Sequence, residues 1–134
     1  MSYLCDTPQN PKSDLTLVFA HGAGAPMDSD FMQALAGLVA ERGVRVIRFE
    51  FPYMERRRRD GTKSPPDRAP VLLDCFRDVI KEFKPGSLII GGKSMGGRIA
   101  SMVADDCGVE FAFPPRDCQR QLRGHRQLAL GQRM

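Results

Sequence analysis

The sequence predicts an α/β fold, in which a parallel sheet has helices on both faces, and three observations lead to this prediction. Short β-type runs alternate with amphipathic helical patterns along residues 15–106. Because consecutive parallel strands are joined by right-handed crossovers, the alternation places helices over the sheet. The chain has 134 residues, enough for one domain, and 42% of them are hydrophobic, enough for a packed core.

The first strand is predicted at Leu15–Ala20, which ends at a His-Gly-Ala-Gly turn. Asp28 and Ser29 follow as candidate N-caps of a helix over residues 30–42, whose apolar side chains recur at helical spacing. Gly43 is a natural C-terminal stop for that helix. These signals predict a strand, a glycine-rich turn and a helix in succession.

The middle of the chain predicts a second strand at Val44–Phe49. Residues 51–70 are rich in proline, glycine and arginine and are predicted to form a loop, with Arg56–Arg59 solvated over the mouth of the site. An apolar stripe at helical spacing predicts a second helix over residues 70–83. The third strand is predicted at Ser87–Ile90.

The two ends of the chain differ from its middle. We divide the sequence into an N-terminal segment, residues 1–14, a folded domain, residues 15–106, and a basic, weakly structured tail, residues 107–134. Within the tail, Val109–Phe113 could form a fourth strand. The positive charge is concentrated in the tail and does not form a basic stripe along the domain, so nucleic-acid binding is not expected.

Other partners and compartments are limited by the composition. No apolar run approaches the roughly 18 residues that predict a membrane span, and the first fourteen residues lack the features of a signal peptide. The four cysteines form no CxxC pair and no metal-ligand spacing, and Cys75 lies beside the apolar stripe of the second helix, where we expect it in the core. We therefore expect a cytoplasmic protein with reduced thiols, no metal and no organic cofactor.

The strongest chemical signal is the run Gly92-Lys93-Ser94-Met95-Gly96, a G-x-S-x-G between the third strand and a third helix. A nucleophilic serine at such a turn has a strained backbone, and side chains two residues before and after it would collide, so Gly92 and Gly96 are expected to be required. The helix behind Ser94 also directs its positive N-terminal end at developing negative charge. The context of strand and helix makes Ser94 the candidate nucleophile.

A phosphate-binding P-loop is the competing interpretation of the Gly-Lys-Ser sequence. That motif, G-x-x-x-x-G-K-[ST], needs glycine where this chain has Ser87. The intervening residues 88–91 have the pattern of a strand, not of a loop that surrounds phosphate. The P-loop interpretation is therefore rejected.

The turn His21-Gly22-Ala23-Gly24 is the second chemical signal. Acyl transfer requires backbone N–H donors for an oxyanion, one after the nucleophile, here Met95, and one from a loop after an earlier strand, here Ala23 or Gly24. Gly22 and Gly24 would let that backbone approach a substrate. The alternative is a glycine-rich turn that only permits tight packing, and His21 is expected to make a structural hydrogen bond.

Several segments together resemble small bacterial α/β-hydrolases related to the hydrolase-like domain of a testis-expressed protein and of a chromatin-complex regulatory subunit. The segments are HGAGAPMDSDFM after the first strand, RFEFPYM (Arg48–Met54), PPDRAPVLL (Pro65–Leu73) and GGKSMGGRIASMVAD (Gly91–Asp105). The resemblance implies an α/β-hydrolase fold and hydrolysis of an ester or related acyl substrate. It also implies that Ser94 is the nucleophile and that Ala23 and Met95 are the oxyanion donors.

The chain departs from this family after the nucleophile. In α/β-hydrolases the acid and then the histidine follow the serine, but only 40 residues follow Ser94 here. His125 is the one histidine among them and the candidate base, although a histidine in an arginine-rich segment is more often only solvated. We therefore expect an incomplete α/β-hydrolase fold, truncated or ending in a shifted reading frame after Asp106.

Two functions follow from these patterns. The first is a serine hydrolase that acts on a small-molecule acyl substrate. The second is a non-catalytic α/β fragment or interaction module that retains the serine turn as a relic and recruits a protein partner through an exposed sheet edge. A serine without a base is a weak nucleophile, which is why both are considered.

Overall fold

The computed structural model describes residues 1–84 and 86–111 of the chain. In this part of the chain the strands form one five-stranded sheet in the order β1-β3-β2-β4-β5. β3, β2, β4 and β5 run parallel to one another, and β1 is antiparallel to β3. The strands are β1 (Leu4–Asp6), β2 (Thr16–Ala20), β3 (Arg45–Phe49), β4 (Leu88–Gly92) and β5 (Glu110–Phe111).

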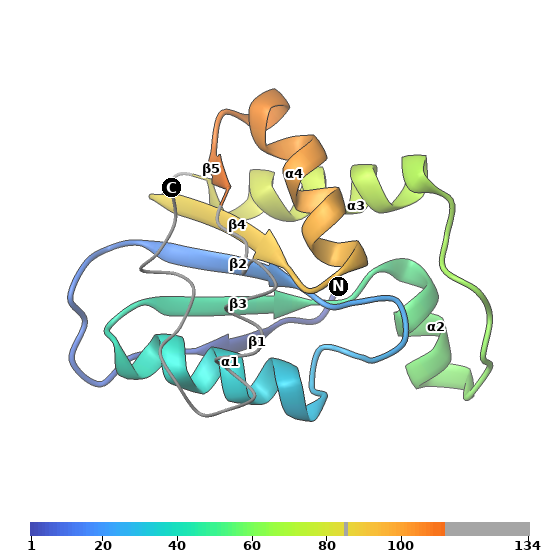
Figure 1. Cartoon of the computed structure of the whole chain (residues 1–134), viewed down its shortest axis with the longest axis horizontal. Helices are drawn as coiled ribbons and strands as arrows, with labels where there is room; N and C mark the ends of the chain where they lie inside the picture. Colours follow the sequence, from blue (N-terminus) through green and yellow to red (C-terminus); the bar gives the residue numbers. More distant parts are fainter. Residues whose placement is uncertain (85, 112–134) are drawn as a thin grey trace.

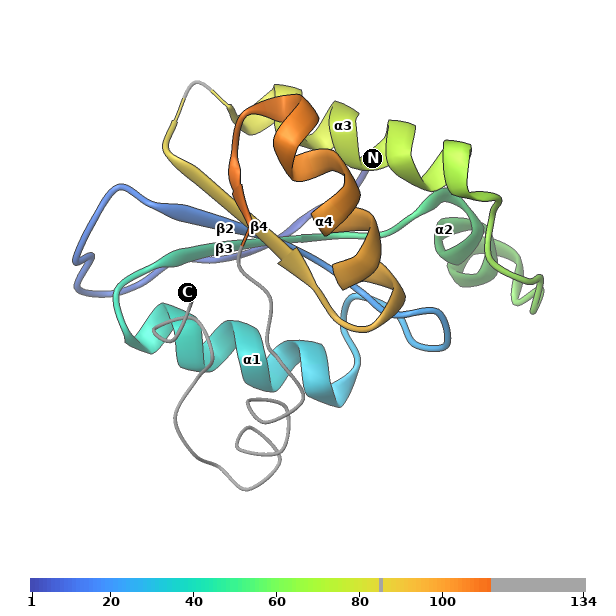
Figure 2. The same ribbon diagram turned by 45° about the horizontal axis from the view of Figure 1, so that its top comes forward.

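The helices lie in two layers, one on each side of the sheet. They are α1 (Asp30–Glu41), α2 (Pro52–Asp60), α3 (Ala69–Phe83) and α4 (Met95–Cys107). α1 covers one face of the sheet, while α3 and α4 lie side by side on the other face (Figures 1 and 2). The short helix α2 lies beyond the carboxyl end of β3 (Figure 1). This confirms the predicted α/β fold with helices on both faces.

The core has two parts because alternate strand residues point to opposite faces. Val18 and Ala20 of β2 are buried in the cluster formed with α3 and α4. Leu17 and Phe19 of the same strand are buried in the cluster formed with α1. Cys75 of α3 is buried as predicted, and burial raises the pKa of its thiol to about 12. Because β2 is a central strand that is buried on both faces, its apolar run is continuous.

A strand in the N-terminal segment was not predicted. β1 pairs with β3, with Leu4 opposite Arg48, and so makes one edge of the sheet antiparallel. Asp6 forms an ion pair of 3.0 Å with Arg48, and the Tyr3 hydroxyl donates to Glu82 at 2.8 Å. These contacts join residues far apart in the sequence, which explains why a local pattern of three residues did not reveal the strand.

The prediction of a loop over residues 51–70 is wrong for its first half, which is helix α2. Pro52 occupies the first turn, where its missing N–H is not needed, and Gly61 ends the helix in a left-handed conformation, φ 74°. Tyr53 and Met54 are buried beneath the helix. The expectation that Arg56–Arg59 form a solvated loop is therefore also wrong: they lie on a helix anchored by its first turn.

The remaining predicted elements agree with the structure within two residues. The strand predicted at Ser87–Ile90 is β4, and the helix predicted over residues 70–83 is α3. The fourth strand predicted at Val109–Phe113 is present as β5, and its last two residues lie outside the described residues, as does most of the predicted tail. None of the helices in residues 1–84 and 86–111 combines the length and apolar character that a bilayer crossing requires.

Candidate active site

Ser94 is at the turn between β4 and α4. Its backbone has φ 54° and ψ −114°, and it is the one non-glycine residue with positive φ among the described residues. Such a conformation costs roughly 1–3 kcal/mol and persists where the surrounding structure enforces it. The side chain is exposed, and α4 begins at the next residue. The structure therefore presents a strained, accessible hydroxyl at a helix N-terminus.

The turn around Ser94 leaves no space for side chains at the glycines on either side of it. A Cβ atom added at Gly92 would lie 2.6 Å from the backbone oxygen of Gly96 and from the backbone nitrogen of Gly97. At Gly96 an added Cβ would collide with the carbonyl oxygen of His21 and lie 2.9 Å from Ala20. Backbone therefore packs directly on backbone where β4 enters α4 next to the end of β2.

The glycine-rich turn after β2 lies against the Ser94 turn. A Cβ added at Gly22 would be 3.3 Å from the Lys93 carbonyl oxygen and 3.7 Å from the Ser94 Cβ. The Lys93 N–H donates to the Ala20 carbonyl at 3.0 Å, which joins the two strand ends. Ala23 and Gly24 are exposed, and nothing lies within 4 Å of a Cβ added at Gly24, so packing does not require glycine there.

The position of these turns within the sheet favours ligand binding. β2 lies between β3 and β4, so the strand that follows β2 in the sequence lies on one side of it and the next strand, β4, lies on the other side. In open α/β sheets, ligands bind at the carboxyl ends of the strands where the strand order reverses in this way. Ser94 and the turn after β2 lie at that point.

His21 is fully buried beside the glycine-rich turn and makes two hydrogen bonds to the backbone. Its Nε2 accepts from the Phe51 N–H at 3.1 Å, so Nδ1 holds the proton of the neutral ring and donates to the Gly22 carbonyl at 2.6 Å. Burial lowers the pKa of the imidazole. The structural hydrogen bond expected for His21 is present, and with both nitrogens engaged the ring is not placed to take a proton from Ser94.

The stability of the fold should depend on pH through His21. The unfolded imidazole has a pKa near 6.5, and the folded pKa is lower, so below that pH the unfolded chain binds a proton that the folded chain does not. We expect full stability above about pH 6.5 and a loss of up to about 1.4 kcal/mol per pH unit from there toward pH 5. Denaturation curves at several pH values measure this loss.

His21→Gln is the matched control for this pH dependence, because it retains polar atoms without an imidazole titration. Its free energy of unfolding should change less than that of the natural chain between pH 6.5 and 5. Parallel curves for the two proteins would contradict the assignment of the pH dependence to His21. A proton NMR titration of the natural chain reports the His21 pKa directly and is independent of how well the variant folds.

Tyr53 of α2 reaches the same turn and was missed by sequence reasoning. Its hydroxyl donates to the Ala23 carbonyl at 2.8 Å and lies 3.4 Å from the Gly22 carbonyl. Its own backbone N–H donates to Asp67 at 2.8 Å. Burial raises the pKa of the Tyr53 phenol to about 12. The hydroxyl therefore keeps its proton near neutral pH and acts as a hydrogen-bond donor to the turn.

A cluster of charged side chains holds the far end of the same loop, and it was also not predicted. Glu50 is 1% exposed and accepts from the Met27 N–H at 3.2 Å and from Arg58 at 2.5 and 3.0 Å. Arg48 donates to the Met27 carbonyl at 2.8 Å. Arg58 also binds Asp28 at 2.8 Å, and this hydrogen bond lowers the pKa of the Asp28 carboxyl. Both polar groups of the Met27 backbone are therefore bonded to buried charges.

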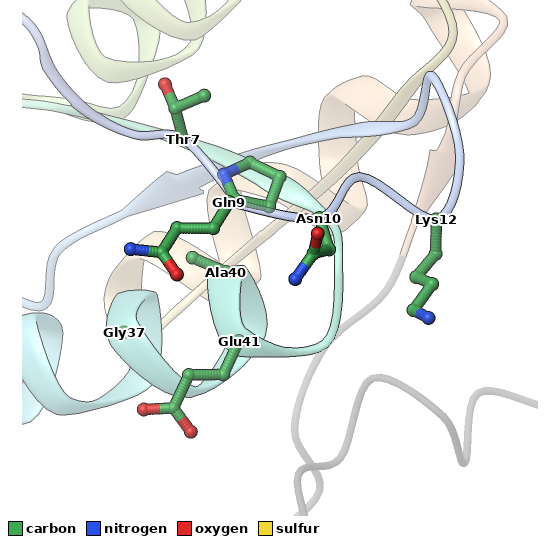
Figure 3. Close-up of a pocket in the computed structure, with 8 residues that line it drawn as sticks. Thr7, Gln9, Asn10, Lys12, Gly37, Ala40 and Glu41 are labelled. Atoms are coloured by element: carbon green, nitrogen blue, oxygen red, sulfur yellow. The ribbon is translucent and has the colours of Figure 1, made fainter.

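Other features lie at the edge of this region or away from it. The Lys93 ammonium lies 5.0 Å from the centre of the Phe31 ring, over the first turn of α1. A pocket of about 560 Å³ is lined at the last turns of α1 by Gly37 and Glu41, at the other end of that helix (Figure 3). Within residues 1–84 and 86–111, no three His, Cys, Asp or Glu side chains form a group that could hold a metal ion.

The structure brings most of the predicted site residues together. Ser94 and Met95 lie on one turn and Gly22, Ala23 and Gly24 on the neighbouring one. His125, the candidate base, lies outside the described residues. The described part of the chain therefore supplies a strained serine and two neighbouring turns.

Comparison with known proteins agrees with this architecture, in which a serine turn joins a strand to a helix in a mostly parallel sheet. Residues 13–116 match the family described as an alpha/beta hydrolase domain, and the chain belongs to that family. No curated protein matches the chain. The family match includes all of the predicted domain, residues 15–106.

Solved structures of other proteins have a similar fold. An alpha-beta serine hydrolase homologue from Coxiella burnetii is 20% identical, with a TM-score of 0.63 over 83% of this chain and 55% of that one. Est1E from Butyrivibrio proteoclasticus is 17% identical, with a TM-score of 0.65 over 83% and 43%. A lidless a/b serine hydrolase from Xanthomonas campestris is 17% identical, with a TM-score of 0.64 over 83% and 53%. The chain thus spans about half the length of these structures, with which it shares the fold.

Proposed function

We propose that the chain is a serine hydrolase whose nucleophile is Ser94 and whose substrate is an ester or a related small acyl compound. The observation that supports this most directly is the positive φ of Ser94, 54°, at an exposed strand-to-helix turn. A serine held in this way beside a glycine-rich turn is typical of a nucleophile elbow. We further place the chain with the small bacterial hydrolases that its motifs resemble.

In the proposed reaction, the Ser94 oxygen bonds to the acyl carbon of the substrate. The carbonyl π electrons move to oxygen, and the N–H groups of Ala23 and Met95 bind the resulting oxyanion. Collapse of this intermediate breaks the bond to the leaving group and gives an acyl-serine, which water then hydrolyses. The Met95 N–H, at the first position of α4, has no intrahelical acceptor and is open to an oxyanion, whereas the next N–H, of Gly96, already donates to the Lys93 carbonyl at 2.9 Å.

The proton of Ser94 must pass to a general base. His21 is not that base, because both of its ring nitrogens are bonded to the backbone. We propose no base among the described residues, and His125 stays the candidate that the sequence offers. The protein partner at a sheet edge also stays a prediction, and no contact in the described residues favours the non-catalytic alternative.

Labelling with a fluorophosphonate probe tests the proposed nucleophile. We expect the full chain to be labelled and Ser94→Ala not to be labelled, because loss of the nucleophile lowers hydrolase rates by up to about 10⁶-fold. Ser101→Ala is the matched control: Ser101 lies exposed on α4, where its hydroxyl donates to the Arg98 carbonyl at 2.7 Å. That variant should label like the natural chain.

Two results would count against the proposal. A folded natural chain that takes up no probe would favour the non-catalytic alternative. Probe uptake that persists in Ser94→Ala would place the reactive group elsewhere. Circular dichroism of each protein establishes that the comparison is made between folded chains.

A further inference from the structure

The contact between Tyr53 and the turn after β2 has a role in the proposed reaction. We propose that Tyr53 is a positioning residue, whose hydroxyl fixes the peptide unit between Ala23 and Gly24 and so orders the turn that carries the Ala23 N–H. The oxyanion-binding turn is then ordered before a substrate arrives. This inference rests on the proposed function, since it concerns the turn that carries the Ala23 donor of the same site.

The geometry of a trans peptide links the Tyr53 bond to the donors. In such a peptide, the carbonyl of one residue and the N–H of the next point in opposite directions. The Ala23 carbonyl points to the Tyr53 hydroxyl, 2.8 Å away, so the Gly24 N–H points away from Tyr53. The Gly22 carbonyl is bonded to His21 at 2.6 Å, so the Ala23 N–H points away from that ring. His21 therefore sets the direction of the Ala23 N–H, the proposed donor, and Tyr53 sets that of the Gly24 N–H next to it.

Tyr53 is itself held in place from several sides. Its ring is fully buried, lies 5.9 Å from the His21 ring, and is covered by the guanidinium of Arg57 at 5.9 Å. Its backbone N–H is bonded to Asp67, which in turn forms an ion pair of 2.9 Å with Arg56. Because the Tyr53 hydroxyl cannot move, it fixes the direction of the Ala23 carbonyl that accepts from it. Oxyanion binding requires N–H donors that are ordered in this way before the reaction.

The hydrogen bond from the Tyr53 hydroxyl serves to orient the Ala23 carbonyl, and not merely to give a buried polar group a partner. Ala23 is exposed and its bond to the hydroxyl is half-buried, so the bond lies at the edge of the core, where a water molecule could take the place of a lost hydroxyl. A water molecule would satisfy the carbonyl but would not hold it in one direction. The Tyr53 bond therefore contributes order to a turn that glycines on both sides of Ala23 would otherwise leave mobile.

Tyr53→Phe removes the hydroxyl and keeps the ring. We expect the limiting rate constant for phosphonylation of Ser94 to fall about tenfold, a part of the roughly 10²–10³-fold that loss of an oxyanion donor costs. The probe concentration at half-saturation should stay within about twofold, because the ground-state contacts are retained. Tyr3→Phe is the matched control, since the Tyr3 hydroxyl donates to Glu82, away from the site, at 2.8 Å.

Amide relaxation measurements provide a second readout that does not depend on labelling. In Tyr53→Phe, the order parameter of the Gly24 N–H should fall from about 0.85 to below about 0.6, with the sheet unchanged. Tyr3→Phe should leave it at the value of the natural chain. Greater mobility throughout the sheet of Tyr53→Phe would make Tyr53 a general packing residue and overturn the inference.

The outcomes separate this inference from the proposed function. A natural chain that takes up no probe overturns the proposed function, and the Gly24 order parameter then decides whether Tyr53 orients the turn. Equal phosphonylation rates in the natural chain and in Tyr53→Phe overturn the positioning role and leave the proposed function intact. A slower rate with a less ordered Gly24 supports both.

Discussion

Gly96→Ala is expected to lower the free energy of unfolding by about 3 kcal/mol or more. This is at or above the upper end of the range that is typical when an extra carbon is forced into a well-packed core. The new methyl group would collide with the carbonyl oxygen of His21 and lie 2.9 Å from the Ala20 Cβ and carbonyl oxygen. All three atoms belong to the end of β2 and the start of its turn, and they cannot move without separating β2 from β4. Urea denaturation followed by circular dichroism measures the loss.

Gly37→Ala is the control for this effect, because it makes the same chemical change within α1. Nothing lies within 4 Å of a Cβ added at Gly37. Alanine is favoured over glycine inside a helix by about 0.5–1 kcal/mol, so this variant should be slightly more stable than the natural chain. Equal stabilities of Gly96→Ala and Gly37→Ala would contradict the close packing between the ends of β2 and β4.

Arg58→Met is expected to lower the free energy of unfolding by about 2–3 kcal/mol. It keeps most of the aliphatic stem but leaves the carboxylate of Glu50, 1% exposed, without its cation. Breaking a buried ion pair costs about 3–5 kcal/mol, and we expect less because the Arg58 side chain is 44% exposed and partly screened by water. Denaturation at pH 7 measures the difference.

Arg59→Met tests whether that loss comes from the Glu50 bond or from the positive charge of α2. Arg59 is the next residue on the helix, its side chain is 66% exposed, and it pairs with the exposed Asp60 at 3.4 Å. Exposed pairs contribute at most about 1 kcal/mol, so this variant should remain close to the natural chain. Similar losses in the two variants would contradict a specific role for the Glu50–Arg58 pair.

Much of the fold could be predicted because its elements have strong local signals. The apolar run of β2, the helical spacing in α1 and α3, and Ser29 as the N-cap of α1 all lie within short windows of sequence. The serine turn was predicted for the same reason, since the pattern of glycines around Ser94 spans only five residues. Local patterns report which backbone conformations a segment prefers, and in these segments the tertiary structure agrees with that preference.

The elements that were missed depend on distant contacts. α2 has four consecutive arginines and resembles a loop in composition, but it is stabilised by the burial of Tyr53 and Met54 beneath it. β1 is three residues long and forms through pairing with β3, some forty residues later in the chain. Neither type of stabilisation is visible in a short window, because the partners are brought together only when the chain folds.

In the candidate site, too, some features could be predicted from the sequence and others could not. The amino-acid sequence by itself determined the two glycine-containing turns and the serine between strand and helix, because steric collisions within a few residues decide which backbone those segments can adopt. Only the tertiary structure decided which backbone groups His21 bonds, that Tyr53 holds the turn after β2, and that Glu50 and Arg58 hold the far end of the same loop. These bonds link residues on different elements, and their distances depend on how the sheet and helices pack.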